Sequence, residues 1–212
     1  MQLPTRIRIP NGPEWAIVEQ VFGPTLPLRQ RIFITDGLGG GGAPFTIPTS
    51  MISALVLPGV IQAALTGLVL NYLGGRDGMV SRALNATGAV GLNPVGLASL
   101  GYLMNVGPGP YANLAATEGT RRLLVHEMAH VWQGANSQLS TTYVFNSIMH
   151  QCNASVHGSS RNGAYAATPG QLWSSYNAEQ QASLIEQWYV AGGRDDHPVF
   201  PYIRDKVRQG IV

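Results

Sequence analysis

The feature that most constrains this chain is the motif His126-Glu127-Met128-Ala129-His130, which lies in a segment whose apolar pattern predicts a helix. Residues four apart on a helix lie one turn above each other, so His126 and His130 can present ring nitrogens to one zinc ion. Glu127 suits a carboxylate that takes a proton from a metal-activated water and later returns it to the leaving amine. The motif therefore predicts a zinc-dependent hydrolytic site with Glu127 as general base.

Three helices are expected in the second half of the chain. The motif helix begins after Thr117, a suitable N-cap, and is expected to end by Gly134. A second helix is predicted over residues 140–151. A third begins at Asn177, where Gln180 completes a capping box, and stops at the glycine pair 192–193.

A catalytic zinc needs a third protein ligand. In the metzincin pattern this is a histidine six residues after the second one, but position 136 is Asn, which excludes that class. A glutamate from a downstream helix can serve instead, and the candidates are Glu179 and Glu186. Glu179 is favoured because its small neighbours Ala178 and Ala182 would let the two helices approach closely. Glu186 is expected to be a solvated or capping partner.

A peptidase site also needs a donor for the transition-state oxyanion. One of the remaining histidines, His150, His157 or His197, or one of the tyrosines Tyr165 and Tyr176 could be that donor, and the sequence does not choose among them.

The N-terminal half is expected to supply a small sheet. Residues 1–35 alternate short apolar runs with Pro and Gly, which predicts strands and turns, and a glycine-rich loop follows at 37–44. Another short strand is expected within 101–106. We therefore predict a single α+β domain over 1–212, with a strand and turn region at 1–45 and a helical active-site region at 117–192. The site is expected in a cleft between the sheet with its motif helix and the third helix.

The low content of charged residues and cysteine restricts which partners and metal ligands the chain can use. Charged residues make up only 11% of the chain, Lys206 is the single lysine, and the arginines are scattered, so nucleic acid is an unlikely partner. Cys152 is the single cysteine, so a metal must use imidazole and carboxylate ligands. Residues 37–75 and 83–117 carry no charge at all. Within the first, 52–73 is expected to be a buried helix, because a Pro-Gly pair and polar residues interrupt it.

Three segments resemble a known family. Residues 124–133 and 176–182, with the lead-in at 21–28, are similar to the gluzincin metallopeptidase domain at the C-terminus of type VI secretion spike (VgrG) effectors. The resemblance implies a zincin-like fold, zinc ligation by His126, His130 and Glu179, and Glu127 as general base. Many gluzincins carry an Asp four residues after the third ligand to orient a ligand histidine. Here that position is Ser183, whose hydroxyl would be a weaker acceptor.

The same resemblance implies a place of action. It suggests an antibacterial toxin that is cytoplasmic in the producing cell, is injected without a signal peptide, and acts on peptides or proteins in the periplasm of the target cell. Residues 1–15 lack the apolar run of a secretory signal, which agrees with this route. A secretion spike, a chaperone or an immunity protein would be its partner.

Two other readings of the sequence stay open. The chain could be a zinc-stabilised binding or adaptor module of a secretion system, whose uncharged surface docks onto a partner. Alternatively, residues 52–73 could insert into a bilayer, so that the toxin acts on the membrane rather than on a peptide.

Overall fold

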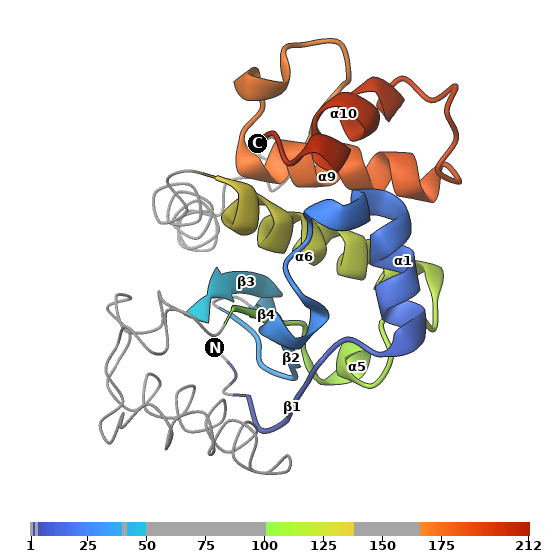
Figure 1. Ribbon diagram of the computed structural model, residues 1–212. Coiled ribbons are helices and arrows are strands. Elements are labelled where there is room, and N and C mark those ends of the chain that lie inside the picture. Colours follow the sequence, from blue (N-terminus) through green and yellow to red (C-terminus); the bar gives the residue numbers. More distant parts are fainter. Residues whose placement is uncertain (1, 3, 40–41, 50–100, 138–165) are drawn as a thin grey trace. The chain divides into compact units, whose positions relative to one another are not determined.

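The computed structural model describes residues 2, 4–39, 42–49, 101–137 and 166–212 (Figure 1). These residues form two compact units that alternate along the chain. The first comprises Met1–Ile9 and Gln30–Tyr111, and the second comprises Pro10–Arg29 and Ala112–Val212. The helices expected at 52–73 and 140–151 lie outside the described residues. The expectation of one domain stays a prediction, and each unit is described by itself.

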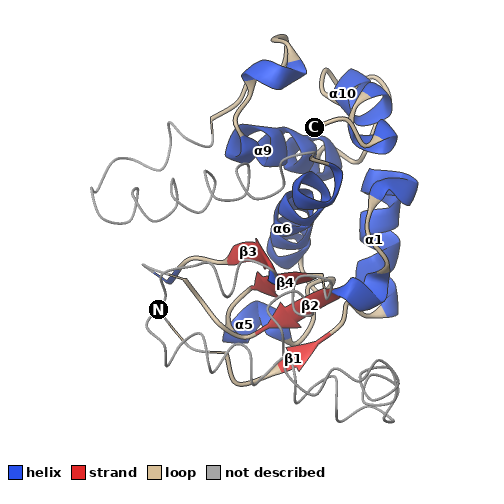
Figure 2. Ribbon diagram, turned by 60° about the vertical axis from the view of Figure 1, so that its left-hand side comes forward, coloured by secondary structure: helices blue, strands red, loops and turns tan. Residues whose placement is uncertain are grey.

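The first unit is built on a mixed four-stranded sheet of order β1-β2-β4-β3 (Figure 2). The strands are β1 (Ile7–Arg8), β2 (Ile32–Thr35), β3 (Phe45–Pro48) and β4 (Tyr102–Asn105), and a short helix α5 (Pro108–Tyr111) follows. β2 and β4 pair in parallel, and β1 and β3 flank them antiparallel. All four residues of β2 are buried, as suits a β-branched and aromatic run in the middle of a sheet. The predicted sheet from the N-terminal half is therefore confirmed.

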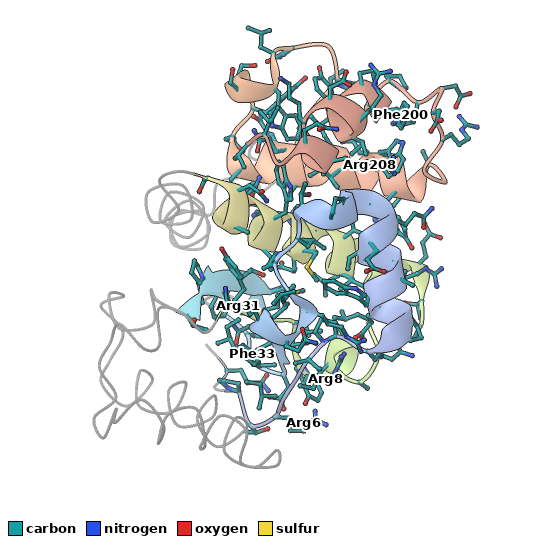
Figure 3. The ribbon with its side chains drawn as sticks, viewed as in Figure 1. Arg6, Arg8, Arg31, Phe33, Phe200 and Arg208 are labelled. Carbon is teal, nitrogen blue, oxygen red and sulfur yellow. The ribbon has the colours of Figure 1, made fainter. Side chains whose placement is uncertain are left out.

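A buried carboxylate ties the N-terminal segment to the end of β2. Asp36 accepts hydrogen bonds from the backbone N–H and hydroxyl of Thr5 and from the backbone N–H and Nε of Arg6, at 2.7–3.0 Å. Burial would raise the pKa of Asp36, but these donors outweigh it and hold that pKa well below its usual range. Arg6 and Arg8, labelled beside β1 in Figure 3, also place their guanidinium groups over the Tyr111 ring, at 4.6 and 5.3 Å from its centroid.

The second unit is helical. Its helices are α1 (Gly12–Phe22), α6 (Glu118–Asn136), α9 (Ala178–Val190) and α10 (Phe200–Asp205). Short 3-10 turns lie at Gly23–Thr25, Trp173–Ser175 and Val207–Gln209, and another at Arg29–Arg31 joins the two units along the chain. Within this unit α1 and α9 both pack against α6 (Figure 1). The described residues thus form an α+β protein.

The expectation of strands and turns throughout 1–35 was wrong for α1. Asn11 and Glu14 form a reciprocal capping box, and a proline lies in the first helical turn. Val18, Val21 and Phe22 then fall on one buried face. The Asn-x-x-Glu spacing with its proline was visible in the sequence and could have identified this helix.

The two helices that carry the predicted ligands begin where the sequence indicates. Thr117 caps α6 and Asn177 caps α9, each through a capping box with the residue three positions later. α9 stops before Gly192 and Gly193, which adopt φ of 87° and 65° as a helix-terminating pair requires. α6 runs two residues beyond the expected end, to Asn136. There the Asn136 side chain donates to the carbonyl of Trp132, one turn back.

Trp132 anchors the motif helix in the core of its unit. Its side chain is fully buried, with the rings of Phe22 and Trp173 each 6.4 Å away. Its indole N–H donates to the carbonyl of Val207 at 3.0 Å and to the Thr25 hydroxyl at 3.1 Å. The opposite face of the same helix is thereby left to carry the histidines.

Across the described ranges we find no helix of the length and apolarity that crossing a membrane would require. Segment 52–73, to which the membrane alternative refers, falls outside them.

Candidate metal centre

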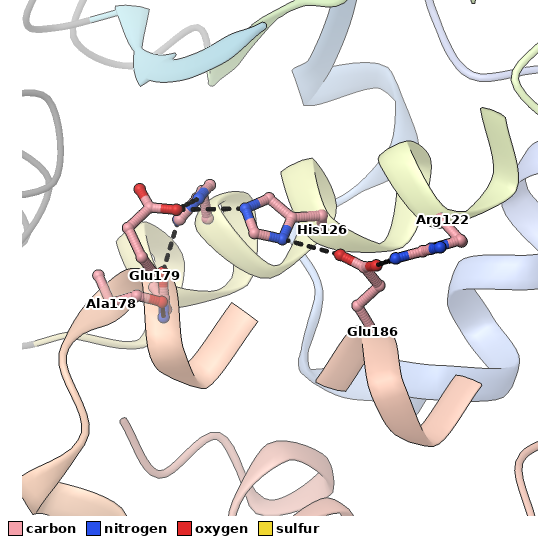
Figure 4. Close-up of polar contacts among 7 residues, drawn as sticks. Arg122, His126, Ala178, Glu179 and Glu186 are labelled. Carbon is pink, nitrogen blue, oxygen red and sulfur yellow. Dashed lines mark hydrogen bonds and ion pairs between the residues drawn. The ribbon is translucent and has the colours of Figure 1, made fainter. Parts of the chain in front are cut away.

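The two motif histidines and Glu179 meet at one point of the helical unit. Glu179 Oε2 lies 3.2 Å from His126 Nε2 and 3.4 Å from His130 Nε2, and all three ligand atoms lie within 4.8 Å of one another (Figure 4). Two ligands bound at about 2.0–2.1 Å to a tetrahedral ion stand about 3.3–3.4 Å apart. The cluster is therefore close enough to hold a metal ion, as the sequence predicted.

Local structure explains how α9 brings its carboxylate to α6. Glu179 is the second residue of α9, directly after Asn177 has capped the helix, and only 3% of its surface is exposed. Ala178 and Ala182 are buried beside it, so small side chains line this part of α9. Gln133 of α6 donates its side-chain N–H to the backbone carbonyl of Ala178 at 3.0 Å, which fixes the start of α9 against the motif helix.

The charges in this cluster are strongly coupled. Burial would lower the pKa of His126, but hydrogen bonds to Glu179 and Glu186 raise it to about 10. The pKa of His130 is also raised: burial opposes the shift, and the charge of Glu179 outweighs it. Burial would raise the pKa of Glu179, yet the two imidazoles hold it well below its usual range. A bound cation must therefore replace protons on these rings.

Glu186 is the outer partner of His126. Its Oε2 lies 3.2 Å from His126 Nδ1, while its Oε1 accepts from Nε and Nη2 of Arg122 at 2.8 and 2.6 Å (Figure 4). The expectation that Glu186 would be a solvated or capping residue was wrong. Its spacing from Glu179 gave the signal, because seven residues are two helical turns and place both carboxylates on one face.

Gln133 is the outer partner of His130. Its Oε1 lies 2.9 Å from His130 Nδ1, one turn along α6. Glu186 and Gln133 thus stand at the Nδ1 atoms of the two rings, where the family resemblance led us to expect Ser183 at one of them. Both rings keep Nδ1 against an outer acceptor and turn Nε2 toward Glu179. Among the described residues, buried His130 Nε2 makes no hydrogen bond of ordinary geometry, and its ion-pair contact is with Glu179 Oε2 at 3.4 Å.

The remaining predicted residues are placed differently. Glu127 is 3% exposed, and its charge acts to raise the pKa of both motif histidines, so it lies close to them. The hydroxyl of Tyr176 donates to the carbonyl of Thr168 at 2.6 Å and accepts from the Gln171 backbone N–H at 3.1 Å. That hydroxyl is engaged with backbone rather than with the cluster.

Of the other oxyanion candidates, His197 accepts at Nδ1 from the backbone N–H of Val199 at 3.3 Å, whereas His150, His157 and Tyr165 lie outside the described residues, as does Cys152. Comparison with known proteins adds no further assignment. No protein-family model matches the chain, and neither the curated proteins nor the solved structures contain a significant match to it.

Proposed function

We propose that this chain is a zinc-dependent metallopeptidase of gluzincin type with a zincin-like arrangement of its motif helix and the downstream helix. His126, His130 and Glu179 would be the zinc ligands. The observation that carries the proposal is the pair of 3.2 and 3.4 Å separations between Glu179 Oε2 and the two Nε2 atoms.

The ligand set favours zinc. Two imidazole nitrogens and one carboxylate oxygen are a common catalytic zinc set, and three protein ligands leave one tetrahedral position open. When bound there, zinc would polarise the substrate carbonyl and lower the pKa of water. Both histidines already direct Nδ1 to an outer acceptor, which leaves Nε2 to the metal.

Glu127 supplies the proton chemistry of this proposal. It follows the first ligand on α6, is buried, and lies close enough to affect both rings electrostatically. As water attacks the scissile carbonyl carbon, the Glu127 carboxylate accepts its proton. It then returns that proton to the nitrogen as the C–N bond breaks, so the carboxylate is regenerated.

The decisive variant is Glu127→Gln, which keeps the size of the side chain but cannot accept the proton. We expect unchanged zinc affinity and about 10²- to 10⁴-fold slower cleavage of a peptide library. Glu118→Gln, on the exposed first turn of the same helix, is the matched control and should cleave normally. Full activity in Glu127→Gln would refute the mechanism. A zinc-loaded wild type inert toward every peptide would favour the binding-module alternative.

The place of action is part of the proposal. Because residues 124–133 and 176–182 resemble type VI spike effector domains, we infer an antibacterial toxin that is injected and cleaves its substrate in the target periplasm. Expression of wild type and Glu127→Ala in the bacterial periplasm and cytoplasm tests this. We expect growth inhibition only in the periplasm and only with Glu127 present. Toxicity that survives Glu127→Ala would favour membrane insertion instead.

A further inference from the structure

Behind His130, the contact with Gln133 continues into a series of buried amide hydrogen bonds that reaches Gln181, a residue with no part in the proposed mechanism. His130 Nδ1 faces Gln133 Oε1 at 2.9 Å, and Gln133 Nε2 donates to Gln181 Oε1 at 3.1 Å. Gln181 Nε2 in turn donates to the carbonyl of Trp173 at 3.2 Å. Both glutamine side chains are 1% exposed. This series of hydrogen bonds therefore runs from His130 through Gln133 of α6 and Gln181 of α9 to the 3-10 turn before α9.

The direction of every bond in this series is fixed by two backbone carbonyls, which can only accept. Gln181 must turn its NH2 to the Trp173 carbonyl, so its oxygen faces Gln133. Gln133 must turn its NH2 to the Ala178 carbonyl, 3.0 Å away, and to that oxygen. Its own oxygen is then left for His130. Amide orientations that would otherwise be ambiguous are thus set by the backbone.

It follows that His130 Nδ1 must be the donor to Gln133 Oε1. A neutral imidazole with its hydrogen on Nδ1 carries its lone pair on Nε2, and this is the atom that lies 3.4 Å from Glu179 Oε2. The opposite tautomer would set two acceptors against each other at a site where His130 is 5% and Gln133 is 1% exposed.

We propose that Gln133 and Gln181 are positioning residues, which fix His130 in the metal-binding tautomer while they tie the start of α9, and with it Glu179, to the motif helix. The inference depends on the metal site proposed above and not on peptide hydrolysis. It makes Gln181, which is linked to His130 through Gln133, part of the machinery that sets metal affinity.

A purely structural role for the same amides has different consequences. If Gln133 and Gln181 only held α9 against α6, their loss would lower the stability of the metal-free protein and leave the His130 tautomer unchanged. If the direction of the amide hydrogen bonds fixes the tautomer, their loss should change the protonation of His130 Nδ1. The state of His130 Nδ1 therefore separates the two roles.

The test uses Gln133→Met and Gln181→Met, which keep side-chain volume and remove every amide donor and acceptor. Gln187→Met is the matched control, because Gln187 is an exposed amide on α9 whose side chain donates to the backbone carbonyl of Ala167. Zinc affinity is measured by competition with a chromogenic chelator. Nitrogen-15 NMR of the imidazoles, in zinc-loaded protein, reports whether His130 Nδ1 carries a protected hydrogen.

We expect zinc affinity to fall about 10- to 100-fold in Gln133→Met, with loss of the protected Nδ1 hydrogen of His130. Gln181→Met should show the same changes to a lesser degree and remains informative if Gln133→Met does not fold. Affinity within twofold of wild type and an unchanged Nδ1 signal in Gln181→Met would overturn the inference alone. A wild type that binds no zinc would overturn the inference together with the metal site, whereas zinc binding without peptidase activity would overturn only the proposed reaction.

Discussion

Two buried carboxylates of this protein invite comparison, Asp36 in the sheet unit and Glu179 in the helical unit. They are 2% and 3% exposed, and the pKa of each is held well below its usual range. Asp36 is surrounded by hydrogen-bond donors from Thr5 and Arg6, two of which are backbone N–H groups. Glu179 instead faces two imidazole nitrogens that can lose their protons.

The difference shows that burial and a lowered pKa do not by themselves mark a functional site. The donors around Asp36 are backbone N–H groups, a hydroxyl and a guanidinium, which do not lose their hydrogens in the pH range of the folded protein. The Asp36 carboxylate therefore has a structural role, in which it holds residues 5–6 against the end of β2. The two imidazoles beside Glu179 can lose their protons and bind a cation instead. A bound metal ion would then stabilise the buried carboxylate in place of those protons. The chemical nature of the partners distinguishes the two sites.

The largest effect that would break this comparison is on metal binding. Structural zinc sites with four protein ligands bind with an apparent free energy of about 10–16 kcal/mol, which is about 2.5–4 kcal/mol per ligand, or roughly 70- to 900-fold in affinity. We therefore expect Glu179→Ala to weaken zinc binding by that factor in a chelator competition. Asp36→Asn should bind zinc like wild type. Equal zinc affinity in the two variants would remove Glu179 from the ligand set.

The second effect is on stability and runs the other way. Asp36→Asn leaves the donors of Thr5 and Arg6 facing a neutral amide. Hydrogen bonds to charged groups contribute about 1.5–3 kcal/mol each, so we expect the free energy of unfolding in urea to fall by about 2–3 kcal/mol. Asn11→Ala, which removes the N-cap of α1, serves as a reference variant. It should lower the free energy of unfolding by about 1 kcal/mol, as is typical for the loss of an N-cap. An Asp36→Asn variant as stable as wild type would show that the charged contacts of Asp36 with Thr5 and Arg6 do not stabilise the fold.

A smaller change is expected at the outer partner of His126. Glu186→Ala removes the acceptor at Nδ1 and should weaken zinc binding about 10- to 100-fold. Arg122→Ala leaves that acceptor in place without its anchor and should have a smaller effect. Zinc titrations of both single variants and the double variant measure the coupling. Strictly additive losses would mean that Arg122 does not act through Glu186.

The smallest expected effect is on the pH dependence of stability in the metal-free protein, where Asp36 and the cluster around Glu179 should act at opposite ends of the pH range. The lowered pKa of Asp36 gives stability that is present above its ordinary value of 3.8 and is lost as the pH falls below it. The raised pKa of His126 gives stability that is present below 6.5 and is lost as the pH rises through about 10.

Unfolding curves between pH 3 and 10 check these signs. The stability difference between wild type and Asp36→Asn should shrink only on the acid side. The difference between wild type and His126→Gln should shrink on the alkaline side. An alkaline loss in the Asp36 pair, or none in the His126 pair, would contradict the assigned protonation states.

Much of the site was predictable because its spacing is helical. The motif at 126–130 fixes two ligands on one face, and the caps at Thr117 and Asn177 fix where their helices begin. Glu186 was misjudged because its role depends on which residue of another helix it meets. The α1 helix was not predicted because proline and glycine are typical of turns, although at its start they follow the Asn11 cap and belong to the first helical turn.

The sequence by itself determined the local order of this protein: the motif helix and its cap, the start and stop of α9, and the strands at 32–35 and 102–105. Those features depend on residues within one or two turns of each other. Only the tertiary structure decided which side chains meet across α6 and α9, 53 residues apart for His126 and Glu179. It also decided that Glu186 of α9 meets His126 of α6, because hydrogen-bond partners on different helices are fixed by helix packing, whereas Gln133 lies one turn from His130 on the same helix.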